Sequence, residues 1–308
     1  MKKLNRRQFL KGTVALGAAT LTATATQAEA APKNVLSPDR MGVLVDTTAC
    51  VGCRQCEFAC KKAHDLPTGN LESYSDRSVF NTMRRPSDTA LTVVNEFRSG
   101  KDDALPTNVK VQCMHCDHPA CVSACIVGAF TKEENGSVIW ATEKCIGCRY
   151  CMVACPFQVP AFEYQKALQP LIAKCDFCFN RTKEGKLPAC VGTCPVEALT
   201  YGPRNEIIRV AREKIRREPE RYRTHIFGEH EVAGTSWMYL ATNDFTELGF
   251  PKLHNKSAPG VSESIQHGIF ASYFPPVFYY SLIGSVMWLS KKRHAADESE
   301  HHKEDGHE

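Results

Sequence analysis

The sequence lacks the signatures of several common functional classes. It has no long run of basic residues, and its 38 basic and 34 acidic side chains nearly balance, so a nucleic-acid partner is not expected. No Walker or dinucleotide-binding pattern is present, and no histidine follows any C-x2-C pair, which argues against attached c-type haem. A separate metal-catalysis motif is also missing, so the chain is not expected to be an independent enzyme.

What the sequence does contain is sixteen cysteines in four runs. The first and third runs read C-x2-C-x2-C-x3-C, and the third ends in Pro156, which completes the bacterial ferredoxin signature. The second run reads C-x2-C-x4-C-x3-C and the fourth reads C-x2-C-x11-C-x3-C. In order, the runs are Cys50, Cys53, Cys56 and Cys60; Cys113, Cys116, Cys121 and Cys125; Cys145, Cys148, Cys151 and Cys155; and Cys175, Cys178, Cys190 and Cys194.

These spacings favour iron–sulfur clusters over other uses of cysteine. A cubane cluster needs thiolates that converge from one short loop, and in two-cluster ferredoxins the last cysteine of each run binds the other cluster. An exported location would permit disulfides, but C-x2-C pairs mostly make poor structural disulfides. Structural zinc has no use for the third and fourth cysteines of a C-x2-C-x2-C-x3-C run. Four [4Fe-4S] clusters are therefore the predicted cofactors.

An internal repeat supports a pairing of the runs. The segments VLVDTTACVGCRQCEFAC from Val43 and VIWATEKCIGCRYCMVAC from Val138 align without a gap, at a spacing of 138 − 43 = 95 residues. Each predicts a short strand that leads into a cluster loop. Asn135-Gly136 predicts a two-residue turn between strands at 129–131 and 137–140. The predicted fold class is α+β, built from duplicated bacterial-type two-[4Fe-4S] ferredoxin domains.

Both ends of the chain carry targeting patterns. Residues 1–30 join an RRxFLK pattern to an uncharged stretch and an A-x-A site, which predicts a twin-arginine signal peptide and export by that machinery. Residues 269–290 are uncharged and reach roughly 33 Å as a helix, which predicts a C-terminal transmembrane helix in contact with membrane lipid. Pro275-Pro276 leaves a surface-lying or core segment open. Basic residues at 291–293 would put the acidic, histidine-rich tail, 291–308, in the cytoplasm and the main domain on the periplasmic side of the inner membrane.

The remaining segments predict supporting structure. The ferredoxin-like region covers residues 31–205 and includes a strand at 91–94. Residues 205–217 predict an amphipathic helix, because their apolar side chains recur on one side. From Pro219 to Gly260, within the region 206–268, the sequence predicts a mostly irregular arm.

The order of the four runs resembles that of a known family. With KCDFC from Lys174 and LPACVGTCP from Leu187, it is similar to the four-cluster electron-transfer subunits of formate dehydrogenases and dimethyl sulfoxide reductases. The segments RRQF, QCMHC, GCRYCMVACP and SESIQHG resemble the HybA-type iron–sulfur subunits of membrane-bound nickel–iron hydrogenases. The resemblance covers most of the chain and is tightest from Met41 to about Gly202.

The resemblance implies four sets of ligands, which we call sites 1 to 4. Site 1 is Cys50, Cys53, Cys56 and Cys194; site 2 is Cys113, Cys116, Cys121 and Cys155; site 3 is Cys145, Cys148, Cys151 and Cys125; site 4 is Cys175, Cys178, Cys190 and Cys60. One departure is Ile126, where the family usually has proline after the fourth cysteine. This departure puts the local turn in doubt.

The same resemblance implies electron transfer without catalysis. The chain would pass single electrons between the small and large subunits of a nickel–iron hydrogenase and a multi-spanning, quinone-reactive membrane subunit. A molybdopterin oxidoreductase or a menaquinone reductase complex stays open as the partner, and a structural membrane anchor is the alternative from another class. Potentials of such clusters range over roughly −700 to +450 mV, so the ligands alone do not give the direction of electron flow.

Overall fold

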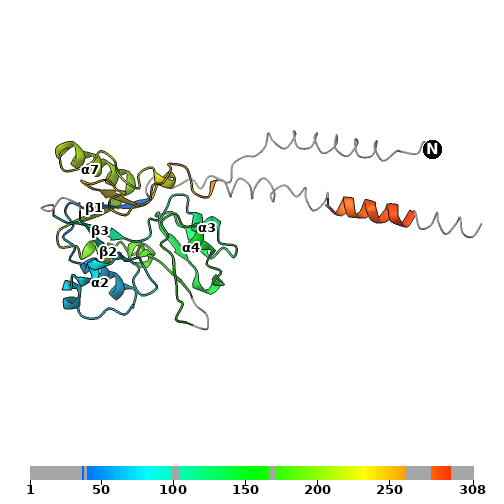
Figure 1. Ribbon diagram of the computed structural model, residues 1–308, viewed down its shortest axis with the longest axis horizontal. Helices are drawn as coiled ribbons and strands as arrows, with labels where there is room; N and C mark the ends of the chain where they lie inside the picture. The colour runs from blue at the N-terminus through cyan, green and yellow to red at the C-terminus, as the bar shows by residue number, and fades with distance from the viewer. Residues whose placement is uncertain (1–36, 38–39, 99–104, 167–170, 261–278, 293–308) are drawn as a thin grey trace, which may run out of the picture. The chain divides into compact units, whose positions relative to one another are not determined.

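The computed structural model describes residues 37, 40–98, 105–166, 171–260 and 279–292 (Figure 1). Residues Asn34–Gly260 form one compact unit, and the two terminal segments, Met1–Lys33 and Val261–Glu308, are assigned to another. The predicted signal peptide at residues 1–30 lies outside the described residues. Within the terminal segments, the structure describes a helix at residues 279–292.

This helix corrects the prediction of a C-terminal membrane span. At about 1.5 Å per residue it is about 21 Å long, which is shorter than a hydrocarbon core of about 30 Å. The first part of the predicted span, 269–278, lies outside the described residues. Among the described helices, none combines the length and apolar character that crossing a bilayer requires. That finding contradicts the transmembrane helix at 269–290, and with it the cytoplasmic tail and the membrane-anchored location.

The main unit is built from short helices and strands, as expected for the α+β class. Its α-helices are α2 (Gln55–Ala63), α3 (Ala120–Ser123), α4 (Tyr150–Ala154), α5 (Phe179–Lys183), α6 (Ala189–Gly192) and α7 (Arg204–Arg217). Its strands are β1 (Met41–Asp46), β2 (Val93–Phe97), β3 (Thr107–Val111), β4 (Phe130–Lys132), β5 (Val138–Trp140), β6 (Ala161–Phe162), β7 (Ile172–Ala173), β8 (Leu199–Pro203) and β9 (Trp237–Leu240). Four 3-10 turns, η1 (Leu71–Ser75), η2 (Ser78–Asn81), η3 (Thr142–Lys144) and η4 (Glu231–Ala233), complete the described elements.

A three-stranded sheet of order β8-β1-β9 forms the centre of this unit. Strand β1 pairs antiparallel with β8 and parallel with β9. Because successive side chains of a strand point to opposite faces, Leu44 faces the apolar side of α7 while Val43 and Val45 face the cysteine-rich core. In Figure 1, α7 accordingly lies on one side of β1, and β3, β2 and α2 lie on the other.

The four cysteine runs fold in two interleaved pairs. Helix α2 of the first run packs against α6 of the fourth, and β1 pairs with β8. In the same way α3 of the second run packs against α4 of the third, and β4 pairs with β5. Each pair thus has the same plan, in which the strand before one run joins the strand after its partner run.

The hairpin β4–β5 and the strand β2 differ in detail from the prediction. Strands β4 and β5 pair with Thr131 opposite Ile139, but their connection spans residues 133–137 instead of a two-residue turn. The extra length arises because Glu133 N–H donates to Ser137 O outside the ladder and Gly136 adopts φ 90°. Strand β2 begins at Val93, two residues after the predicted start of the strand at 91–94. The helix predicted at 205–217 is α7, which begins one residue earlier.

The larger difference is the predicted irregular arm. Residues Trp237–Leu240 form β9 in the central sheet, and none of their side chains is more than 1% exposed. Four apolar or aromatic residues in a row fit a strand that is buried on both faces, which alternation does not reveal. Residues 206–260 are therefore part of the core of the main unit and not an appendage to it.

Candidate iron–sulfur centres

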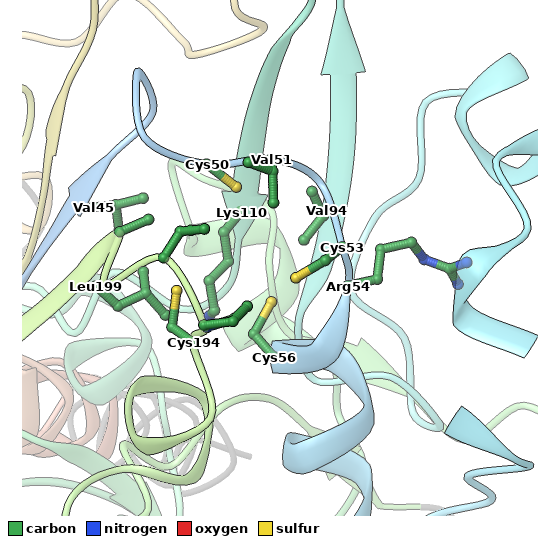
Figure 2. A pocket seen from close by; sticks show the side chains of 13 residues that line it. Val45, Cys50, Val51, Cys53, Arg54, Cys56, Val94, Lys110, Cys194 and Leu199 are labelled. Carbon is green, nitrogen blue, oxygen red and sulfur yellow. The ribbon is translucent and has the colours of Figure 1, made fainter. Parts of the chain in front are cut away.

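The four site 1 cysteines line one pocket, although Cys194 is far from the other three in sequence (Figure 2). Cys50, Cys53 and Cys56 come from the loop between β1 and α2, and Cys194 follows α6. Burial, together with the nearby thiols of Cys194 and Cys53, raises the pKa of Cys50 to about 11. The thiolate form is therefore disfavoured unless a cation is bound.

The backbone of the site 1 loop curls through two left-handed residues. Gly52 has φ 69°, and a Cβ added there would lie 2.3 Å from Asn108 Oδ1. Arg54 has φ 59° and immediately precedes α2. The amide of Asn108 donates to Cys50 O at 3.1 Å and fixes the loop against β3. Glycine is thus required by both its backbone conformation and the space available.

The third run repeats this conformation. Gly147 has φ 67° and Arg149 has φ 62°, at the same places in the C-x-G-C-R sequence as Gly52 and Arg54. Each arginine immediately precedes a short helix that carries the third cysteine of its run. The internal repeat seen in the sequence is therefore also a repeat of backbone geometry.

At the other three sites, thiols from two distant runs lie within electrostatic reach of one another. Burial and then the thiols of Cys113, Cys155 and Cys121 raise the pKa of Cys116, which identifies the neighbours in site 2. In site 3, burial and then Cys145, Cys148 and Cys125 raise the pKa of Cys151 to about 11. In site 4, burial followed by Cys190, Asp176 and Cys60 raises the pKa of Cys178 to about 12, against a lowering hydrogen bond from the backbone of Ala189.

The donor sets fit iron–sulfur clusters. All sixteen cysteines are free thiols, and each site gathers four of them from two distant runs. Four thiolates are the donor set of a [4Fe-4S] cluster. When bound, such a cluster takes up and releases one electron at a time.

The turn after Cys125 is intact despite Ile126. Gly128 N–H donates to Cys125 O at 3.1 Å, and Gly128 has φ 61°. The turns after Cys155 and Cys194 have the same three-residue hydrogen bond, at 3.0 and 3.4 Å, and a residue of positive φ in the same place. In the turn after Cys125 a glycine occupies that place, and the Ile126 side chain is exposed.

Three buried lysines accompany the cysteines, and sequence reasoning missed them. Lys132 lies 3.8 Å from Asp117, and its burial lowers its pKa to about 8 against the attraction of that carboxylate. Lys174 donates to Val138 O and Cys175 O and lies over the Trp140 ring. The available signal was a lysine within an apolar strand pattern, as in VKV and IAK.

Lys110, the third buried lysine, lines the site 1 pocket. Burial lowers its pKa, but the thiolates of Cys190, Cys56 and Cys175 raise it more, so the net shift is upward. Among the described residues, neither Lys110 nor Lys174 has an ion pair with a carboxylate, whereas Lys132 does. A buried ammonium without a carboxylate is costly unless another negative group balances it.

The histidines near the cysteines have structural partners. His64 lies 2.8 Å from both Cys60 O and Asp176 Oδ1. His115 is fully buried, and its Nδ1 accepts the Val138 N–H at 2.8 Å. The tilted contact of its ring with Phe177, at 5.0 Å between centroids, joins the second and fourth runs.

Comparison with known proteins gives concordant matches. Residues 107–204 match the model of the 4Fe-4S dicluster domain, and residues 3–23 match that of the twin-arginine translocation signal sequence. A protein of Nitratidesulfovibrio vulgaris is 47% identical, over 83% of this chain and 70% of its own length. The hydrogenase-2 operon protein HybA of Escherichia coli O157:H7 is 31% identical, over 89% of this chain and 92% of its own length. The iron–sulfur subunit of the nitrate-inducible formate dehydrogenase of Escherichia coli K12 is 30% identical, over 84% and 89%.

Proposed function

Because this chain belongs to the family of iron–sulfur electron-transfer subunits that includes HybA and the formate dehydrogenase iron–sulfur subunit, we propose that it connects a nickel–iron hydrogenase to a quinone-reactive membrane subunit. The hydrogenase would contribute its small and large subunits. The twin-arginine signal supports export, so this chain would work on the exported side of the membrane. The observation that carries the proposal is the gathering of sixteen thiols into four groups of four.

The ligand sets that we propose for four [4Fe-4S] clusters are sites 1 to 4 as defined above. Two distant runs contribute to each set, so the clusters would hold the two halves of each pair together. The packing of α2 on α6 and of α3 on α4 supports this assignment. Each of these two contacts joins the two runs that supply a proposed pair of sites.

The neighbouring thiols of different sites support a linear order, 1–4–2–3. Cys56 of site 1 interacts electrostatically with Cys190 of site 4. Cys175 of site 4 interacts in the same way with Cys113 of site 2, and Cys121 of site 2 interacts with Cys151 of site 3. Single electrons would thus pass along adjacent sites, with sites 1 and 3 at the ends.

The exposure of the side chains fits sites 1 and 3 as ends. All four cysteines of site 4 are buried, whereas Cys148 of site 3 is exposed. Around site 3, the apolar side chains of Ile126, Ile146 and Val153 are 72%, 62% and 81% exposed. At site 1, Val51 is 52% exposed. Apolar surface beside a redox centre suits a protein partner that excludes water from the contact.

Iron analysis and one substitution test the conduit. We expect about sixteen iron atoms per chain, and a value near zero would defeat the proposal. Cys148→Ser should interrupt hydrogen-dependent quinone reduction by the purified complex, because it damages a terminal site. Unchanged electron flow in a variant shown to have lost the site 3 cluster would exclude a serial path through that site.

The catalytic partner has a second candidate. Relatives at about the same identity include the formate dehydrogenase iron–sulfur subunit, and 54% of this chain matches a component of the anaerobic dimethyl sulfoxide reductase of Escherichia coli K12 at 36% identity. A molybdopterin enzyme or a menaquinone reductase complex could therefore occupy the hydrogenase's place. Purification in mild detergent separates the candidates: nickel in the complex supports the hydrogenase, and molybdenum rejects it.

A further inference from the structure

The side chain of Lys110 is held in a fixed position beside site 1. Its Nζ donates to Gln112 Oε1 at 2.9 Å and lies 4.4 Å from the centroid of the Trp237 ring. Gln112 in turn donates to Tyr239 OH at 2.7 Å, and Tyr239 OH donates to Lys110 O at 2.8 Å. The residue is 2% exposed, so solvent does not share in holding the charge.

The surroundings of Lys110 offer it no carboxylate among the described residues, but they do offer cysteine thiolates. It lines the pocket together with the four cysteines of site 1, and Figure 2 shows its side chain extending through that pocket. The cysteines with which it interacts most strongly are Cys190 and Cys175 of site 4 and Cys56 of site 1. Lys110 is thus a cation at the junction of two proposed cluster sites.

We propose that the Lys110 ammonium raises the reduction potentials of the clusters at sites 1 and 4. The proposal rests on the proposed function, since it assumes that clusters occupy these sites. One-electron reduction makes a cluster more negative by one unit, and a nearby buried cation stabilises that added charge in a medium of low effective dielectric. Sites 2 and 3 interact less with Lys110, so the effect is local to one half of the path. Lys110 would be a positioning residue for charge and not a ligand.

The test is an EPR-monitored potentiometric titration of the full-length holoprotein and its Lys110→Met and Lys110→Gln variants, each with its iron content measured. Two of the four midpoint potentials should fall in the neutral variants. At a fixed applied potential, the ratio of reduced to oxidised cluster should decrease at least tenfold, which is about 59 mV for a one-electron couple. The shift should persist at high salt, because a buried charge is poorly screened.

Two further variants are the controls. Lys110→Arg keeps the charge and should keep both potentials near their original values. Lys214→Met removes a lysine that is paired with Asp46 at 2.8 Å on another part of the molecule, and it should leave all four potentials unchanged.

Several results would overturn the proposal. These are unchanged potentials in an iron-replete neutral variant, or equal shifts at all four clusters. If both neutral variants lose iron while Lys110→Arg keeps it, the role of Lys110 is structural. Absence of iron from the unmodified protein would instead reject the proposed function, so the two failures are distinguishable.

Discussion

Asp117 is the residue whose charge we expect to matter most for the stability of the main unit. Its carboxylate is buried and lies among three cations from distant parts of the chain. Arg40, which precedes β1, donates to it through two nitrogens at 2.8 and 3.0 Å. Lys132 of β4 lies at 3.8 Å and Arg204 of α7 at 3.9 Å. One carboxylate thus links the two cysteine-run pairs to the C-terminal part of the unit.

Asp117→Asn keeps the shape of the side chain but removes its charge, so all three cations lose their counter-charge. Breaking a buried ion pair by removing one partner costs about 3–5 kcal/mol. For a unit of this size, 1 kcal/mol corresponds to about 2–4 °C in Tm, so the variant should melt about 6–20 °C lower. The side chain of Arg40 is 13% exposed and keeps some hydration, which favours the lower part of that range.

Thermal unfolding of the iron-replete protein, monitored by cluster absorbance and far-UV circular dichroism, measures this change. Cluster loss makes unfolding irreversible, so all variants need one scan rate. Glu184→Gln is the matched control, because its pair with Lys186 is 60% exposed on both sides and should change Tm by little. If Asp117→Asn melts within about 2 °C of the original protein, the carboxylate does not join the parts of the unit as we argue.

Three other predictions concern the loop, the sheet and the C-terminal part of the main unit. Gly52→Ala should lower iron content at site 1, because alanine is strained at φ 69° and its Cβ would clash with Asn108; Gly128→Ala, with no atom within 4 Å of the added Cβ, controls for positive φ alone, and equal iron loss in both would contradict the clash. Hydrogen bonds from Lys214, Thr48 and Tyr222 outweigh burial and lower the pKa of Asp46, so its stabilisation is present above the unfolded pKa of about 3.9 and is lost as pH falls through the folded value. The Tm deficit of Asp46→Asn should therefore close in acid, and a deficit independent of pH would refute this. A chain ending at residue 217 should fail to assemble its clusters, whereas one ending at 260 should succeed; normal iron content in the shorter chain would show that β9 is dispensable.

The cysteine pattern predicted more of the site than of the scaffold. Cysteine spacing is set by the chemistry of cluster binding, so it survives in a single sequence and predicts which runs belong together. The span at 269–290 was predicted from composition alone, and the described helix there is too short to cross a bilayer. Strand β9 was missed because four consecutive buried residues have no alternation, and its parallel partner β1 is almost 200 residues earlier in the chain.

The buried lysines illustrate why the rest of the site was not predictable. Whether a lysine in a strand points into solvent or into the core depends on what the opposite face of the sheet packs against, and that information is not local. For Lys110 the deciding contacts are with Trp237 and Tyr239, which belong to a strand that was itself not predicted.

Strand β9 therefore does more than complete the sheet. Its Leu240 and Met238 pack with α7 on one face, while Trp237 and Tyr239 hold Lys110 on the other, next to the site 1 pocket. Because adjacent residues of a strand point to opposite faces, one strand serves both the helix layer and the charge at the cluster sites. Any change that shifts the register of β9 by one residue would exchange these faces, so it would expose apolar surface and displace the cation together. Folding of the C-terminal part of the unit and the electrostatics of sites 1 and 4 are thus coupled through a single element.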